Sequence, residues 1–231
     1  MNTRTLEPLW GLPMRIISGT LKGKKLLTPG KGSLRPTSDR VKESMFNILG
    51  KEVEGKVVLD LFSGTGNVGI EALSRGARRV TFVENTREAY RLIERNLLAC
   101  RMEGRSEILL QEVDRGLRFL KAKAECFDLI FMDPPYEKGF VRKTVEILGA
   151  LKIYHEGSLL VIEHTRREPL PELSGSWHLI RQRRIGDTVL SFLTPVIQSG
   201  SDQGKLKTEE QAKNDEKGIF HGKSSHLSRF F

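Results

Sequence analysis

The sequence contains a tetrapeptide whose residue types could perform chemistry: Asp133, Pro134, Pro135 and Tyr136, directly after an apolar run. The two prolines fix the backbone and remove two N–H donors, so the tetrapeptide offers only acceptors, the Asp133 carboxylate and nearby carbonyls. Such acceptors suit an amino group, and they could direct the lone pair of an exocyclic base amine toward an electrophile. The Tyr136 ring offers a surface on which a base can stack. We interpret these residues as the candidate catalytic group, with a Pro-Pro turn and a capping Asp as the alternative.

A second group of residues fits a nucleotide-binding loop. Gly64, Gly66 and Gly69 have the Gly-x-Gly-x-x-Gly spacing, in which absent side chains let a ligand approach the backbone and the following helix. By itself this spacing is also compatible with a dinucleotide site, or with a tight turn that binds nothing.

Two carboxylates narrow the choice of ligand for that loop. Asp60 lies four residues before Gly64, where it would repel a pyrophosphate and attract a cationic ligand. Glu84 lies 20 residues after Gly64, where a carboxylate can accept hydrogen bonds from both hydroxyls of a ribose. The pair therefore argues against NAD and predicts a ligand with a ribose, an adenine and a positive centre.

The rest of the sequence predicts the elements that bring these motifs together. Strands are expected at 57–60, 80–84, 108–110, 129–133 and 159–163, and helices at about 67–75, 86–100, 115–123 and 139–151. Strands that alternate with helices indicate a parallel sheet covered on both faces. Segments 177–185 and 188–194 predict a closing antiparallel hairpin. We therefore predict an α/β fold with a doubly wound, mostly parallel seven-stranded sheet, and both motifs at the carboxyl ends of its strands.

Four segments are expected along the chain. Residues 1–13 are expected to be an extension that is disordered or precedes the true start at Met14. Residues 14–55 are expected to form a basic hairpin at 14–27 and a helix capped by Thr37 or Ser38. Residues 56–196 are expected to form the core. Residues 197–231 are polar with nearly balanced charge, which predicts a disordered tail.

The positive charge is concentrated near the N-terminus. The 231-residue chain has a formal net charge of +9, and the stretch from Met14 to Lys42 alone carries a net +7 from eight basic residues and one acid. Such a stretch favours a polyanionic partner over a face that is merely solvated.

Composition excludes several classes of protein. The sequence has no apolar run long enough to span a membrane and no signal peptide, so we expect a cytoplasmic protein with no membrane partner. Cys100 and Cys126 cannot form a disulfide framework, and we expect both to be buried. The five scattered histidines predict no metal site.

Three sets of residues resemble a known family. The glycine loop and the Asp133 tetrapeptide look like those of class I S-adenosylmethionine-dependent amino-methyltransferases, which have a Rossmann-like fold. Met14–Gly19 and the segment from Arg35 to Asn47 resemble the RsmD family, which methylates N2 of a guanine in 16S ribosomal RNA. The resemblance covers about residues 14–194. It implies S-adenosyl-L-methionine as the cofactor.

The resemblance also implies roles for individual residues. Asp133, Pro134 and Tyr136 would bind the target guanine, and Glu84 would hold the ribose. The implied cofactor-binding residues are Asp60, Phe62, Ser63, Gly64, Thr65, Gly66, Glu84, Asn85 and Asp114. Near the adenine, Glu112 and Asp114 are both candidates, and we prefer Asp114. The residues expected to contact RNA are Arg15, Lys22, Lys24, Lys25, Arg35, Thr37 and Arg40.

The implied reaction is direct methyl transfer to a guanine that lies in a loop or is flipped out, with no metal and no covalent enzyme intermediate. We expect a monomer that acts on 16S ribosomal RNA or on the assembling small ribosomal subunit. Three alternatives stay open: a DNA adenine-N6 methyltransferase, a tRNA guanine-N2 methyltransferase, and a non-catalytic RNA-binding assembly factor. The lack of a separate target-recognition domain between the motifs argues against the first. The intact glycine loop, Glu84 and Asp133 argue against the last.

Overall fold

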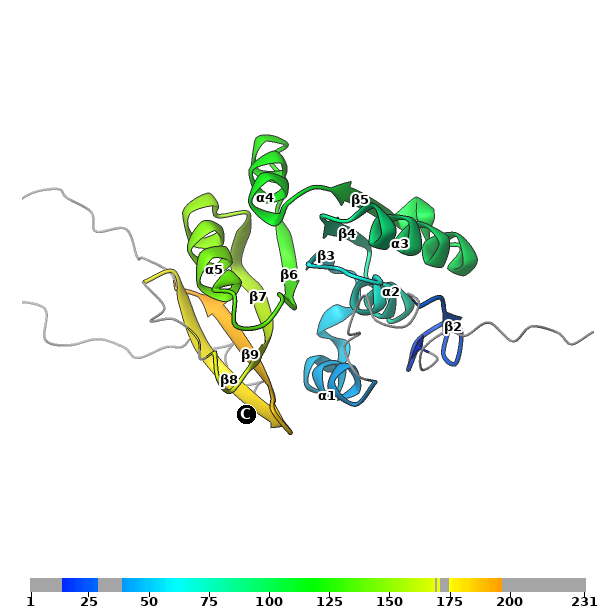
Figure 1. Cartoon of the computed structure of the whole chain (residues 1–231), viewed down its shortest axis with the longest axis horizontal. Helices are drawn as coiled ribbons and strands as arrows, with labels where there is room; N and C mark the ends of the chain where they lie inside the picture. Colours follow the sequence, from blue (N-terminus) through cyan, green and yellow to red (C-terminus); the bar gives the residue numbers. More distant parts are fainter. Residues whose placement is uncertain (1–13, 29–38, 169, 171–174, 197–231) are drawn as a thin grey trace, which may run out of the picture. The chain divides into compact units, whose positions relative to one another are not determined.

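The fold is an α/β sandwich that follows a small N-terminal hairpin (Figure 1). A computed structural model describes residues 14–28, 39–168, 170 and 175–196. The predictions for residues 1–13 and 197–231, and for Arg35 and Thr37, lie outside this range. The hairpin pairs β1 (Met14–Arg15) with β2 (Lys25–Leu26) in antiparallel register, as its sequence predicts.

The central sheet has the strand order β5-β4-β3-β6-β7-β9-β8. Its strands are β3 (Val57–Leu61), β4 (Arg79–Glu84), β5 (Ser106–Leu110), β6 (Phe127–Met132), β7 (Tyr154–Thr165), β8 (Trp177–Ile185) and β9 (Thr188–Pro195). Strands β3 to β7 are joined by parallel ladders, whereas β9 runs antiparallel to both β7 and β8. The predicted doubly wound, mostly parallel seven-stranded sheet is therefore confirmed.

Helices cover both faces of this sheet. They are α1 (Asp39–Leu49), α2 (Asn67–Ser74), α3 (Arg87–Cys100), α4 (Val113–Ala122) and α5 (Phe140–Leu151), with 3-10 turns η1 (Gly50–Val53) and η2 (Glu103–Arg105). Side chains alternate between the faces along β3: Val58 packs with residues of α1, α2 and α3, whereas Leu59 packs with residues of α4 and α5. Among the described residues, no helix is both long enough and apolar enough to cross a membrane.

A buried ion pair fastens the N-terminal hairpin and α1 to α2. The Glu71 carboxylate accepts hydrogen bonds from the backbone N–H of Ile17 at 2.7 Å and of Ser18 at 3.0 Å. Its Oε2 lies 3.4 Å from Nζ of Lys42, and both side chains are fully buried. Burial lowers the pKa of Lys42, and the charge of Glu71 opposes that shift. Lys42 therefore belongs to the interior, although its charge counts toward the basic stretch in the sequence.

The structure also corrects the expectation for one cysteine. Cys100 is buried, but Cys126 is exposed. It lies immediately before Phe127, where β6 enters the core, so the burial of the strand starts one residue later.

Candidate functional site

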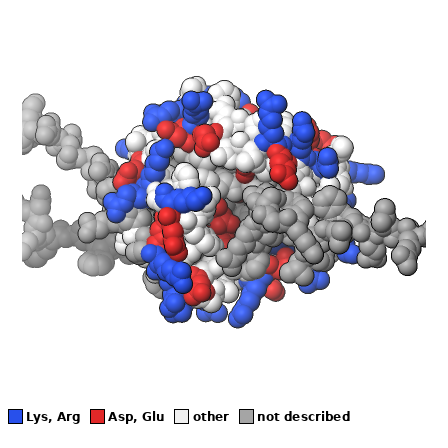
Figure 2. Space-filling model, in the orientation of Figure 1, with Lys and Arg blue, Asp and Glu red and all other residues white. Residues whose placement is uncertain are grey.

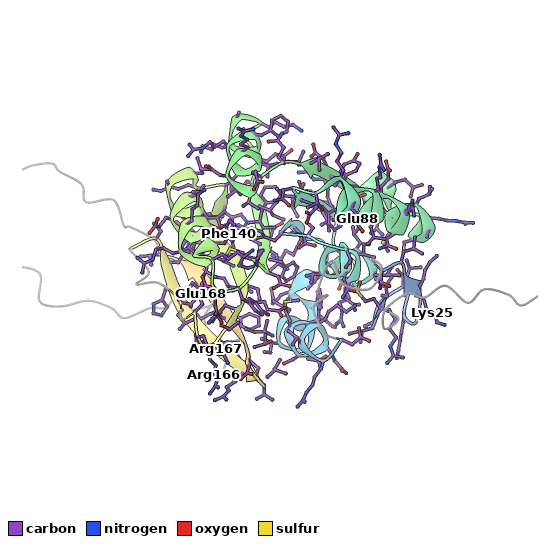
Figure 3. All side chains as sticks on the ribbon, in the orientation of Figure 1. Lys25, Glu88, Phe140, Arg166, Arg167 and Glu168 are labelled. Carbon is purple, nitrogen blue, oxygen red and sulfur yellow. The ribbon has the colours of Figure 1, made fainter. Side chains whose placement is uncertain are left out.

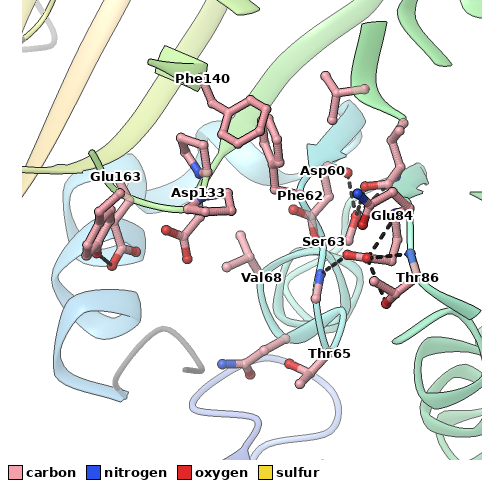
Figure 4. Close-up of a pocket in the computed structure, with 18 of the residues that line it drawn as sticks. Asp60, Phe62, Ser63, Thr65, Val68, Glu84, Thr86, Asp133, Phe140 and Glu163 are labelled. Atoms are coloured by element: carbon pink, nitrogen blue, oxygen red, sulfur yellow. Dashed lines mark hydrogen bonds between the residues drawn. The ribbon is translucent and has the colours of Figure 1, made fainter. Parts of the chain in front are cut away.

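A pocket of about 470 Å³ lies at the carboxyl ends of β3, β4, β6 and β7 (Figure 4). The chain leaves β3 toward α2 on one face and β6 toward α5 on the other, so the loops after these neighbouring strands separate and leave a crevice. Its lining residues are Val41, Asp60, Phe62, Ser63, Gly64, Thr65, Asn67, Val68, Val83, Glu84, Asn85, Thr86, Glu112, Val113, Asp133, Pro134, Pro135, Tyr136, Phe140, Glu163 and Thr188.

Asp60 lies at the base of the pocket and is almost completely buried. Its Oδ2 accepts a hydrogen bond of 2.9 Å from the backbone N–H of Gly69, in the first turn of α2. A Cβ at position 69 would stand 2.3 Å from the Phe82 ring and 2.9 Å from Asp60 Oδ2, so only glycine allows this approach. Burial raises the pKa of Asp60 well above its usual value; the Gly69 hydrogen bond opposes this, and the nearby Asp133 and Glu84 carboxylates add to it.

Glu84 accepts hydrogen bonds from two loops, the glycine loop and the loop that leads from β4 into α3. Its Oε2 accepts from the Gly64 N–H at 2.9 Å, and its Oε1 accepts from the N–H groups of Asn85 and Thr86, each at 2.9 Å. The Thr86 hydroxyl, which also caps α3, donates to the same oxygen at 3.0 Å. These donors fix the carboxylate at the pocket wall, where it has acceptor capacity left for a ligand.

The glycine loop has an unusual backbone. Phe62, Gly64 and Gly66 all have positive φ angles, of 58°, 54° and 74°. At Phe62 this conformation is strained, and it places the ring beside Phe140 with a centroid distance of 5.6 Å. The Ser63 hydroxyl donates to the Asp60 carbonyl at 2.6 Å, so it stabilises the loop from within. Gly66 does not line the pocket, and a Cβ at this position would lie 3.2 Å from the Ile93 side chain and 3.4 Å from that of Ile70.

Glu112 and Asp114, the two candidates for the adenine contact, differ in their position relative to the pocket. Asp114 does not line the pocket: α4 begins at Val113, and the Asp114 carboxylate accepts from Arg118 one turn later at 2.9 Å. Glu112 precedes the helix and lines the pocket, where its Oε1 accepts from the Asn85 amide at 3.1 Å.

The Asp133 tetrapeptide closes the other side of the pocket. The Tyr136 hydroxyl donates to Glu163 Oε1 at 3.1 Å, which anchors the ring against β7. Burial, with the charges of Glu163 and Asp133, raises the pKa of Tyr136 well above its usual value. The sequence offered one signal for Glu163, since it is a carboxylate at the end of a predicted strand, as Asp60 and Glu84 are.

Asn67 is a second residue that motif reasoning did not single out. It is buried and lines the pocket, and its Oδ1 accepts a hydrogen bond from the Lys42 ammonium. Since an ammonium must face the amide oxygen, the Nδ2 donor faces away from Lys42. This Nδ2 is buried and has no hydrogen-bond partner among the described residues. A buried donor of this kind is suited to an acceptor on a ligand.

The charge of the pocket is opposite to that of the protein. The lining contains five carboxylates, on Asp60, Glu84, Glu112, Asp133 and Glu163, and within the described ranges (14–28, 39–168, 170 and 175–196) no Lys, Arg or His lines it. Figure 2 shows acidic side chains in the hollow at the centre of this face, with Lys and Arg side chains around its periphery. The pocket therefore favours a cationic ligand or a donor-rich edge of a base, and it disfavours phosphate.

The described residues expected to contact RNA lie outside the pocket. Arg15, Lys22, Lys25 and Arg40 are exposed, and Arg15 lies 3.6 Å from Asp39. Lys24 is only partly exposed and donates to the Ala99 carbonyl of α3. Lys24 therefore helps to hold the hairpin against α3, in addition to contributing positive charge.

Comparison with known proteins places the chain in a family. A family described as conserved hypothetical protein 95 matches residues 14–194. Ribosomal RNA small subunit methyltransferase D of Haemophilus influenzae is 35% identical over 179 residues, covering 75% of this chain and 89% of that protein. The protein of the same name from Escherichia coli K12 is 31% identical over 189 residues, covering 82% and 93%. The solved structure of yhhF from Escherichia coli has a TM-score of 0.69 and 30% identity, covering 78% of this chain and 97% of that chain. The motifs, the fold and this similarity agree: the chain belongs to the RsmD family.

Proposed function

We propose that this protein transfers a methyl group from S-adenosylmethionine to the exocyclic N2 amine of a guanine in small-subunit ribosomal RNA. The observation that carries the proposal is the arrangement of the pocket lining: Asp133 and Glu163 lie on one side, and Ser63 and Glu84 lie on the other (Figure 4). Tyr136 is on the side of Glu163, to which its hydroxyl donates. Membership of the RsmD family supports the coarser part, methyltransferase activity on ribosomal RNA, because relatives of similar length carry that name.

The pocket fits the proposed cofactor. Asp60 and Glu84 supply carboxylates for a positive centre and for ribose hydroxyls, and Glu112 and Asn85 supply polar groups beside them. The unpartnered Asn67 Nδ2 offers a donor to a carboxylate such as that of an amino acid. When bound, S-adenosylmethionine supplies a methyl group on a positively charged sulfur. None of the described residues that line the pocket is a cation that would repel it.

Asp133 and its prolines would orient the amine that is methylated. The Asp133 carboxylate accepts hydrogen bonds from an amino group, which turns the amine lone pair away from the ring system of the base. The Tyr136 ring, fixed through its hydroxyl to Glu163, provides a surface for stacking. The main catalytic contribution of these residues is alignment of the two reactants.

Two neighbouring carboxylates favour guanine over adenine. The Watson–Crick edge of guanine presents adjacent donors, N1–H and the N2 amine, whereas adenine presents one amine beside an acceptor nitrogen. Glu163 accepts from the Tyr136 hydroxyl, Asp133 lies three residues before Tyr136 in the same loop, and Figure 4 shows both carboxylates on the same side of the pocket. Facing two carboxylates, adenine would leave its ring nitrogen against an acceptor, which is unfavourable.

The test is a transfer assay with labelled S-adenosylmethionine and small ribosomal subunits from cells that lack the gene, followed by mapping of the labelled nucleoside. We expect a single N2-methylguanine in the small-subunit RNA. Label in transfer RNA or in the adenine of DNA would replace this proposal with one of those activities. Binding to the particle without any transfer would indicate an assembly factor.

A further inference from the structure

A second cavity, of about 190 Å³, adjoins the pocket on the side of the Asp133 tetrapeptide. Its lining residues are Tyr136, Glu137, Thr165, Arg166, Arg167, Asp187 and Thr188. Tyr136 and Thr188 line both cavities, so the second begins where the proposed base site ends. Arg166 and Arg167 follow β7 directly and are exposed, and Figure 3 labels both near Glu168.

Because the main pocket is acidic, the phosphate of a nucleotide whose base enters it would have to be bound by cations outside the pocket. A nucleotide that inserts its base beside Asp133 brings a phosphate within one sugar of that base. The five carboxylates of the pocket exclude the phosphate, which must remain outside. The arginines of the second cavity are cations on the adjoining surface, next to the Tyr136 ring.

Both arginines can exchange their present partners for a phosphate at little cost. Arg166 lies 3.3 Å from Asp187, whose side chain is 81% exposed, and Arg167 lies 3.9 Å from Glu137, whose side chain is 55% exposed. Ion pairs this exposed contribute about 0–1 kcal/mol. A guanidinium binds a phosphate through two parallel hydrogen bonds, so phosphate is the better partner.

The turn that carries the arginines is bonded to the tetrapeptide loop. The Glu168 carboxylate accepts from the backbone N–H of Glu137 at 2.6 Å and of Gly139 at 3.1 Å. The Thr165 hydroxyl accepts from the N–H groups of Arg167 and Glu168. The backbone that bears the two cations is thus held at a set distance from the backbone that bears Asp133.

We propose that Arg166 and Arg167 bind the phosphodiester of a nucleotide next to the target base, as an RNA contact separate from the N-terminal basic hairpin. This inference rests on the proposed function, because it takes the occupant of the main pocket to be a base of an RNA strand. It predicts that the pair affects RNA binding and leaves cofactor binding unchanged.

The test compares the R166A/R167A variant with wild type in binding to small ribosomal subunits over a range of salt concentrations. Each lost phosphate contact lowers the slope of log affinity against log salt by about 0.7–0.9, so we expect a slope smaller by between about 1 and 2. The charge-conserving variant R166K/R167K should keep most of the slope. R118A/K123A removes two exposed, ion-paired cations, one on α4 and one directly after it, neither of which lines either cavity, and should leave the slope unchanged.

Calorimetry with S-adenosylmethionine separates a phosphate contact from support of the loop. Unchanged cofactor affinity in R166A/R167A, together with the smaller slope, supports the proposal. An unchanged slope, an equal loss in R118A/K123A, or a parallel loss of cofactor affinity would overturn it. If wild type neither binds nor methylates the particle, the proposed function itself fails, whatever the variants do.

Discussion

At the scale of single residues, Asp133 is the side chain on which transfer should depend most. Replacing it by alanine removes the acceptor for the amine, and we expect the single-turnover rate to fall at least about 100-fold, the scale of losing one preorganised hydrogen-bonding group in an active site. Cofactor affinity, measured by calorimetry, should change little, because Asp60 and Glu84 remain. A variant with near-normal turnover would contradict the role given to Asp133.

Glu163 should decide which base is accepted. Glu163→Gln replaces one acceptor by a donor, and we expect kcat/KM for the guanine substrate to fall by roughly tenfold to a hundredfold, as for one bidentate base contact. Tyr136→Phe is the matched control, because it removes the hydroxyl bonded to Glu163 and keeps the ring. It should have the smaller effect. Equal losses in both variants would assign Glu163 to holding Tyr136 instead.

Asp60 should link cofactor binding to stability. Burial raises its pKa in the folded protein, so between the unfolded and folded pKa values the folded state binds more protons, and stability falls as pH rises through that window. Asp60→Asn keeps an oxygen for the Gly69 N–H and removes the charge. We expect this variant to be more stable by about 1–3 kcal/mol at neutral pH and to bind the cofactor more weakly.

Thermal unfolding over a series of pH values checks the prediction for Asp60. The gain in stability should shrink as pH falls toward the usual pKa of an aspartate, because both proteins are then uncharged at this position. A gain that does not depend on pH would show that charge is not its cause.

At the scale of elements, the attachment of the hairpin to α2 depends on Glu71. Glu71→Ala leaves Lys42 as a buried charge without its counterion and leaves two hairpin N–H groups without their acceptor, so we expect a loss of about 3–5 kcal/mol in urea unfolding. Hydrogen exchange at Ile17 and Ser18 should also become faster. Glu94→Ala, at an exposed position of α3, should stay within about 0.5 kcal/mol of wild type.

The elements were also the part of the fold that local sequence could predict best. Each predicted helix of the sheet region agrees with the structure to within two residues, because apolar spacing and turn residues are local signals. The position of Asp114 has a local cause too: α4 begins two residues earlier than predicted, and the Asp114 carboxylate pairs with Arg118 on that helix instead of lining the pocket.

Contacts between distant segments could not be predicted in this way. The sequence places Lys42 in the basic stretch and predicts that it is exposed. Only the packing of α1 on α2 brings its ammonium to Asn67 and Glu71. Thr188 reaches the pocket because β9 pairs with β7 in a register that no single segment encodes. Glu163, in contrast, could be predicted in the same way as Asp60 and Glu84, because it is a carboxylate at the end of a predicted strand.

At the scale of the whole molecule, the basic surface should control RNA binding through salt. Lys22 and Lys25 are exposed on the hairpin, and Lys25 is labelled there in Figure 3. We expect Lys22→Ala with Lys25→Ala to reduce the salt slope of binding to small ribosomal subunits by between about 1 and 2. R118A/K123A is again the control. If the slope does not change, the hairpin does not contact RNA phosphates.

The five carboxylates of the pocket also bear on turnover. A donor that enters with a positive charge on sulfur leaves as a neutral thioether once its methyl group is gone. Its Coulomb attraction to Asp60, Glu84 and Asp133 is then smaller. We therefore expect these carboxylates to bind the charged methyl donor more tightly than the neutral thioether product. The same side chains then favour both release of the product and binding of the next donor molecule.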